Sequence, residues 1–152
     1  GLGIPAEPLF RSSIEELKND PFVFAHELGH ALDFTILENM NSDPEFIRIW
    51  TEELEAYKAN SGDKEATAIQ YFTDAMRGAN SAKEECIAEA TAIISGYIKT
   101  GHENSSLGVR SIVLEQNFPR LIAYVGNAID NPEEYLKKRR ENSPSANELP
   151  FY

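Results

Sequence analysis

The sequence has a single cysteine, Cys86, which excludes an internal disulfide. It also has no run approaching the roughly 20 apolar residues that a membrane-spanning helix requires, and its start shows no signal-peptide pattern. These absences exclude a disulfide-stabilised fold and predict no membrane span. They leave the compartment open, because a secreted protein and an effector domain of a larger protein are both compatible with such a sequence.

Positive charge is scarce as well. The chain has 14 basic and 25 acidic residues, which gives a formal net charge of −11. Because an acidic surface repels phosphate backbones, we expect no nucleic-acid partner. The one basic run, at residues 137–140, is interpreted as the solvated end of a helix near the C-terminus.

The sequence shows neither internal repeats nor the alternating pattern of a β-strand. It has 152 residues, 41% of them hydrophobic, which suits one ordinary domain with its own core. We therefore predict a mainly α fold with little or no β-sheet. A single domain is expected over residues 1–142, followed by an extended C-terminal tail over residues 143–152.

Three prolines follow good helix-capping residues. Asp20, Asp43 and Asn131 each precede a proline, which places a side-chain N-cap before a proline at the first helical position. Turn residues and apolar periodicity give the remaining boundaries. Helices are predicted over about 13–19, 21–40, 44–60, 64–77, 82–99, 109–116, 119–129 and 132–142, with a loop at 104–108.

The predicted helix 21–40 contains polar residues in an unusual setting. On a helical wheel its hydrophobic side chains surround almost the whole circumference, which is typical of a buried helix. His26 and His30 lie one turn apart on one face. Asp33 follows on that face, and Glu27 lies at its edge. Because unpaired polar groups are costly to bury, this cluster requires partners.

A divalent metal ion is one such partner. Two neutral imidazoles at positions i and i+4 can bind the same Zn²⁺, and a glutamate at i+1 can activate the zinc-bound water. We therefore predict His26 and His30 as zinc ligands, Glu27 as the catalytic base and Asp33 as a supporting residue. The alternative is two hydrogen-bonded core histidines without a metal. His102 falls in a predicted loop and is expected to be solvated.

A catalytic zinc site usually has a third protein ligand. The metzincin class would place histidine or aspartate six residues after His30, but Ile36 stands there, so that class is rejected. The helix at 82–99 offers Glu85 and Glu89, one turn apart on the flank of its apolar stripe. We predict Glu85 as third ligand and Glu89 as the acceptor that orients a histidine ring. The two could exchange roles, and the alternative is that both decorate a surface.

The sequence HELGHALD followed by EECIAEA resembles the gluzincin-type metallopeptidases, in particular the group of the anthrax lethal factor catalytic domain and bacterial Pro-Pro endopeptidases. The resemblance implies a zincin-like helical domain that binds Zn²⁺. It implies His26, His30 and Glu85 as metal ligands, with Glu27 as the base. It covers roughly residues 22–127, although only the two zinc motifs are specific.

The position of the catalytic tyrosine differs from that family. The family carries it seven residues before the third ligand, where this sequence has Gly78. Tyr71, the nearest tyrosine upstream, is therefore predicted to stabilise the oxyanion, with Tyr97 as the alternative. The run Glu-Glu-x-x-Ala-Glu is also similar to the zincin-like domains of plasmid antirestriction proteins.

These residues together predict a zinc metallopeptidase that hydrolyses a peptide or protein substrate through a zinc-bound water activated by Glu27. A zinc-binding but catalytically silent domain of a larger bacterial protein is the first alternative. A purely structural helical module is the second. The oligomeric state is left open by the sequence.

Overall fold

The computed structural model describes residue 15 and residues 20–61, 70, 72–73, 79–96 and 106–143. Within these ranges the protein is mainly α-helical and has no strand, which confirms the predicted fold class. No helix in the described ranges is both long and apolar enough to cross a membrane. The elements are α2 (Pro21–Thr35), the 3-10 helix η1 (Met40–Ser42), α3 (Pro44–Ser61), α6 (Ala79–Ile94), α7 (Ser106–Asn117), α8 (Pro119–Asp130) and α9 (Pro132–Asn142).

The predicted helix starts are confirmed at all three prolines. The side chains of Asp20, Asp43 and Asn131 each accept a hydrogen bond from a backbone N–H in the first turn that follows. These acceptors satisfy N–H groups that have no partner within their own helix. Most of each of the predicted helices at 13–19 and 64–77 lies outside the described residues, as does the tail beyond residue 143.

Helix α2 is shorter than the sequence predicts, because it ends at Thr35 rather than near Met40. Glu38 and Asn39 have left-handed backbone conformations, with φ of 52° and 58°. A right-handed helix cannot continue through such residues, and asparagine adopts this conformation more readily than most. Helix α6 begins earlier than predicted and ends at Ile94 rather than near residue 99, because Gly96 has a left-handed backbone conformation, with φ of 77°. Residues 106–108 belong to α7 rather than to a loop.

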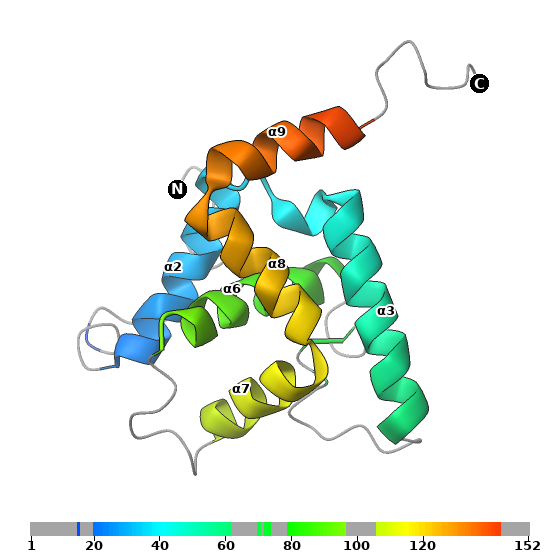
Figure 1. The fold of residues 1–152 in the computed structure, drawn as a ribbon. Helices are drawn as coiled ribbons and strands as arrows, with labels where there is room; N and C mark the ends of the chain where they lie inside the picture. Colours follow the sequence, from blue (N-terminus) through cyan, green and yellow to red (C-terminus); the bar gives the residue numbers. More distant parts are fainter. Residues whose placement is uncertain are drawn as a thin grey trace, which may run out of the picture.

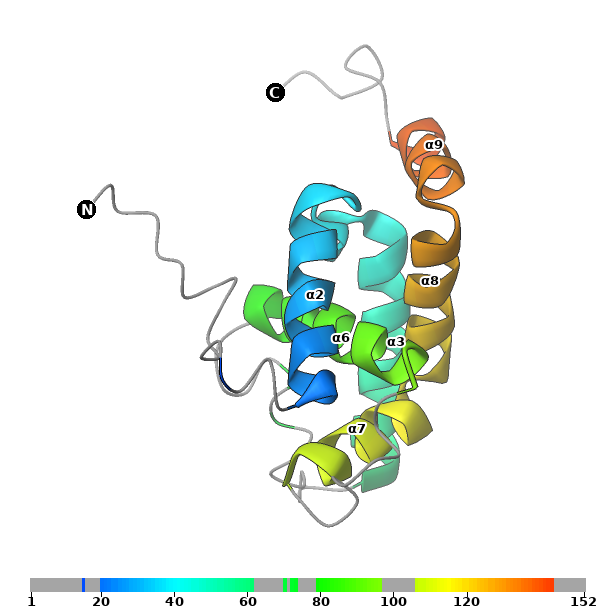
Figure 2. The ribbon, with the colours of Figure 1, turned by 90° about the vertical axis from the view of Figure 1, so that its left-hand side faces the viewer.

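Helix α6 lies at the centre of the fold. It packs against α2 and α8 and also contacts α7 and η1. Figure 1 shows α6 crossing the middle of the molecule, and in Figure 2 it runs across the direction shared by α2, α3 and α8. Side chains on different faces of α6 therefore meet different neighbours, and one of those faces is directed at α2.

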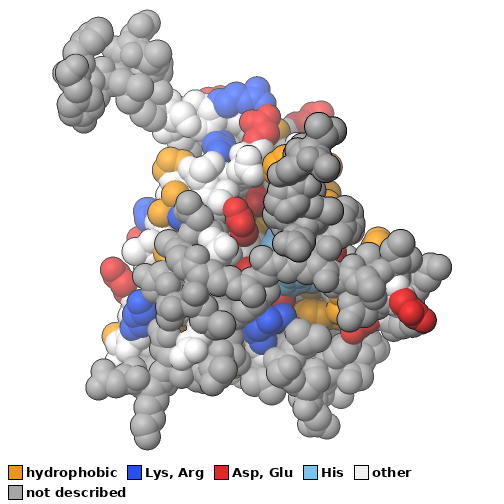
Figure 3. All heavy atoms as spheres, turned by 180° about the vertical axis from the view of Figure 1, so that it is seen from behind, with side chains coloured by type: hydrophobic (Ala, Val, Ile, Leu, Met, Phe, Trp, Pro, Cys, Tyr) orange, Lys and Arg blue, Asp and Glu red, His pale blue; other side chains and the backbone are white. Residues whose placement is uncertain are grey.

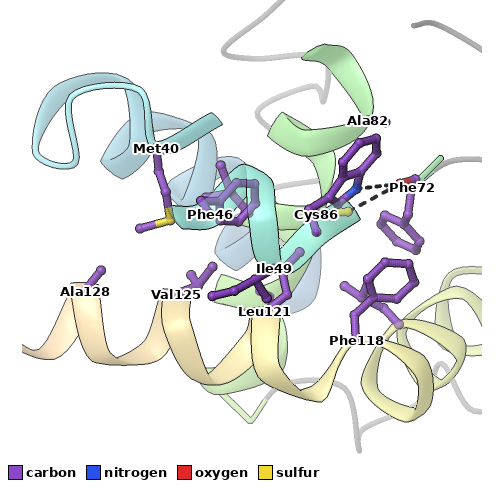
Figure 4. Packing of buried hydrophobic residues seen from close by; sticks show 14 of the residues in the cluster. Met40, Phe46, Ile49, Phe72, Ala82, Cys86, Phe118, Leu121, Val125 and Ala128 are labelled. Atoms are coloured by element: carbon purple, nitrogen blue, oxygen red, sulfur yellow. Dashed lines mark hydrogen bonds between the residues drawn. The ribbon is translucent and has the colours of Figure 1, made fainter. Parts of the chain in front are cut away.

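The main hydrophobic core lies between α3, α6 and α8 (Figure 4). The Trp50 indole Nε1 donates to the carbonyl of Phe72 at 3.2 Å, and the Cys86 thiol lies 3.6 Å from the same oxygen. Burial raises the pKa of the Cys86 thiol, so the only cysteine is a core residue without thiolate character. The core includes Met40, Phe46, Ile49, Ala82, Phe118, Leu121, Val125 and Ala128.

The prediction that α2 is buried on all sides is wrong. Phe24 is 51% exposed and Phe34 is 62% exposed, and Leu28 and Ile36 are exposed as well. Within the described part of the chain α2 packs along one side, against α6, so its opposite side remains at the surface. The polar cluster is nevertheless buried, because it lies toward the packed side.

Arg139 of α9 holds the turn that follows α2. Its guanidinium donates to the carbonyl oxygens of Leu37 and Glu38, at 3.0 and 2.9 Å, and to the Ser42 hydroxyl at 2.9 Å. The basic run at 137–140 is thus only partly the solvated helix end that the sequence indicated. Arg139 fixes the exit of α2, the helix that carries the histidines.

Candidate metal centre

The candidate site lies where α2 meets α6. Gly29 separates the two predicted histidine ligands, and its lack of a side chain lets the backbones of the two helices approach closely. On α6 the facing residues are also small, with Ala88 and Ala92 fully buried. The small residues at this crossing bring His26 and His30 within reach of carboxylates on α6.

Three predicted ligands converge at this crossing. The Nε2 atom of His26 lies 3.0 Å from Oε2 of Glu85, and the Nε2 atom of His30 lies 3.5 Å from the same oxygen. One potential ligand atom from each residue lies within 4.8 Å of the other two. Two imidazole nitrogens and a carboxylate oxygen form the donor set of one class of catalytic zinc site.

These side chains are largely buried, with 10% of His26, 12% of His30 and 7% of Glu85 exposed. The histidine side chains are visible on the face shown in Figure 3, beside hydrophobic and acidic side chains. The site is therefore largely shielded from bulk water, with a small part of each histidine side chain exposed.

The electrostatic interactions within the cluster favour a positive charge on His26 and a negative charge on Glu85. Burial acts to lower the pKa of His26, but hydrogen bonds and charges from Glu85 and Glu89 outweigh it and raise the pKa to about 9. Burial acts to raise the pKa of Glu85, but His26 and His30 bring it well below the usual range. Glu85 is therefore ionised at neutral pH, and a metal ion that binds here must displace a proton from His26.

Glu89 is fully buried directly behind His26. Its Oε2 atom accepts a hydrogen bond from Nδ1 of His26 at 2.8 Å, which turns the other ring nitrogen, Nε2, toward Glu85. An acceptor in this place fixes the orientation of a metal-binding imidazole and makes it a better ligand. Of the two carboxylates that the sequence left interchangeable, Glu89 has the acceptor position and Glu85 faces both histidines.

Two residues of α7 complete this network, and neither was predicted from the sequence. The Ser111 hydroxyl donates to Oε1 of Glu89 at 2.5 Å, and Nε of Arg110 lies 3.9 Å from the same oxygen. They follow the zinc motifs by at least 20 residues and belong to no recognisable motif, so only the packing of α7 against α6 identifies them.

Glu27 follows His26 in α2, and its side chain is buried. Its Oε2 atom has no hydrogen-bond partner among the described residues. A buried carboxylate oxygen without a partner is costly, so its presence in a native protein calls for an explanation. A metal ion accompanied by water would supply a hydrogen-bond partner for this oxygen.

The remaining predicted site residues lie elsewhere or outside the described ranges. Asp33 accepts a hydrogen bond from the backbone N–H of Met40 at 2.6 Å, so it stabilises the exit of α2 rather than bonding to a histidine ring. Burial raises the pKa of Asp33 to about 6. Tyr71, Tyr97 and His102 are not among the described residues.

Comparison with known proteins gives no relative. No family model, no curated protein and no solved structure matches the chain. The residues of this chain and their geometry are therefore the basis on which a function can be assigned.

Proposed function

We propose that the protein is a zinc-dependent metallopeptidase, with His26, His30 and Glu85 as metal ligands and Glu27 as the catalytic base. One observation carries the proposal: two histidines and a glutamate converge, and the residue after the first histidine, Glu27, has a buried carboxylate oxygen without a partner in the described part of the chain. The substrate would be a peptide or a protein.

A zinc ion at this site would act as a Lewis acid and lower the pKa of a water molecule toward neutrality. Glu27 accepts a proton from the attacking water as its oxygen bonds to the carbonyl carbon. When the C–N bond breaks, Glu27 returns that proton to the leaving amine nitrogen. Tyr71 is proposed to donate a hydrogen bond to the oxyanion, with Tyr97 as the alternative.

Substitution of Glu27 tests this role. Glu27→Gln keeps the size of the side chain but cannot accept the proton. The variant is expected to bind zinc like the wild type and to cleave a peptide library at least about 100-fold more slowly, the lower range for loss of general-base catalysis. Glu84→Gln is the control, because Glu84 is exposed on α6 one residue from Glu85 and should leave the rate unchanged. If Glu27→Gln cleaved the peptides as fast as the wild type, Glu27 would not be the catalytic base.

A catalytically silent zinc-binding domain is the second candidate. The exposed apolar side chains of Phe24, Leu28 and Phe34 on α2 favour it, since such residues are common on protein-binding surfaces. This candidate predicts that the wild type binds zinc, loses stability when a chelator removes it and cleaves no peptide of the library. Cleavage that Glu27→Gln abolishes would decide in favour of the peptidase.

A further inference from the structure

A continuous line of hydrogen bonds joins three helices at the candidate metal centre. Ser111 of α7 donates to one oxygen of the Glu89 carboxylate, at 2.5 Å. The other oxygen of that carboxylate accepts from Nδ1 of His26 on α2, at 2.8 Å. Ser111 and Glu89 are both 0% exposed, so water cannot readily replace either contact.

This arrangement makes the orientation of Glu89 depend on α7. A carboxylate is planar, and its rotation decides whether the second oxygen lies in line with the His26 N–H. The Ser111 hydroxyl holds the first oxygen and so sets that rotation. The Arg110 guanidinium lies farther away, with Nε at 3.9 Å, and adds positive charge on the same side. In a buried network of this kind each hydrogen bond strengthens its neighbour.

We propose that Ser111 is a positioning residue of the metal centre, which acts through Glu89 to hold the His26 ring in the orientation that presents Nε2 to the metal. This inference rests on the proposed metal site. It extends the site from two helices to three, because α7 must be docked against α6 for the hydroxyl to reach Glu89. Tight metal binding then requires α7 in place, although α7 supplies no ligand.

Zinc affinity measured by competition with a chromophoric chelator tests the proposal without an activity assay. Ser111→Ala is expected to weaken zinc binding about tenfold, the lower end of the range for outer-shell partners of metal ligands. The absorption spectrum of the Co²⁺-substituted variant should also change, because the His26 ring is less well oriented. Asn117→Ala is the matched control: Asn117 lies on the same helix and bonds the backbone carbonyl of Val113, without contact to Glu89.

A second substitution covers the case in which Ser111→Ala does not fold. Ser111→Cys nearly preserves the volume but offers a weaker hydrogen-bond donor, so its zinc affinity should fall between those of wild type and Ser111→Ala. Wild-type affinity in Ser111→Ala or Ser111→Cys would overturn the inference, as would an equal loss in Asn117→Ala. If the wild type itself bound no zinc, both this inference and the proposed function would fail. If the wild type bound zinc and substitution of Ser111 did not change the affinity, only this inference would fail.

Discussion

A Cβ atom built on Gly29 would lie 2.7 Å from the Cα atom of Ala88, closer than real Cβ atoms approach a backbone atom. It would also lie 2.9 Å from the Cβ atom of Thr91. The backbones of α2 and α6 can therefore reach their observed separation only because residue 29 has no side chain. The histidines on either side of Gly29 depend on that separation to face Glu85.

Substitution Gly29→Ala should consequently damage the proposed metal centre. Alanine favours helix over glycine by about 1 kcal/mol, but the clash with the Ala88 backbone forces the two helices apart. We expect lower zinc affinity together with lower thermal stability of the zinc-free protein. Isothermal titration with zinc and calorimetric melting measure the two effects.

Gly126→Ala supplies the control for that experiment. Gly126 also lies within a helix, but a Cβ atom there would meet only the side chain of Ile94, at 3.3 Å from Cδ1. Ile94 is 42% exposed, so its side chain has room to move. The variant should bind zinc normally and be no less stable than the wild type. Equal zinc affinity in Gly29→Ala and Gly126→Ala would show that the close crossing is not required.

The side chain of Glu53, on α3, caps the N-terminal end of α8. Its two carboxylate oxygens accept hydrogen bonds from the backbone N–H groups of Arg120 and Leu121, at 2.8 and 3.0 Å, in the first turn of α8. Glu53→Gln replaces one acceptor by an NH₂ group that faces an N–H. The free energy of unfolding in urea should fall by about 1 to 3 kcal/mol, the cost of leaving a buried donor unsatisfied.

The neighbouring Glu52 is the matched control for Glu53. It is exposed and pairs with Arg48 and Arg120 at the surface, and surface pairs contribute little to stability. Glu52→Gln should therefore change the free energy of unfolding much less than Glu53→Gln. Similar effects of the two substitutions would contradict the capping role of Glu53.

Two tyrosines should respond unusually to alkaline pH. Tyr124 and Tyr135 both donate to Oδ2 of Asp43, at 2.6 and 3.0 Å, and burial followed by this carboxylate raises the pKa of each phenol above its usual value of about 10. The folded protein keeps these protons after the unfolded chain has lost them. The stability that they contribute is complete below about pH 10 and is lost as the pH rises further.

Ultraviolet absorbance of phenolate, recorded together with circular dichroism, checks this behaviour. Tyr124 and Tyr135 should ionise only as the helical signal is lost. In the Tyr124→Phe variant, the number of tyrosines that show this delay should fall by one. Ionisation of all six tyrosines in the chain while the fold is intact would contradict the assignment.

The sequence predicts which residues of the candidate site lie together where helical spacing alone places them. His26 and His30 share a face because they are one turn apart, and the same spacing puts Glu85 and Glu89 on one flank of α6. The capped prolines fix the starts of α2, α3 and α9. These are local relationships, which periodicity and capping rules describe well.

Relationships between distant elements could not be predicted in the same way. Ser111 and Arg139 carry no local signal, because their roles follow from how α7 and α9 dock against other helices. The exposure of Phe24 and Phe34 has the same origin: a wheel shows which side chains are apolar, whereas tertiary packing decides which of them are covered. In the sequence, only Asn39 indicates that α2 ends early, because asparagine adopts a left-handed conformation more readily than most residues.

The zinc content of the protein purified at neutral pH, determined by elemental analysis, tests the metal centre most directly. The expected result is one zinc ion per chain in the wild type, and its loss when His30→Ala and Glu85→Gln are combined. The Glu84→Gln variant, changed one residue away, should keep the metal. A wild type without zinc, or a double variant that retains zinc, would contradict the assignment of His26, His30 and Glu85 as a metal centre.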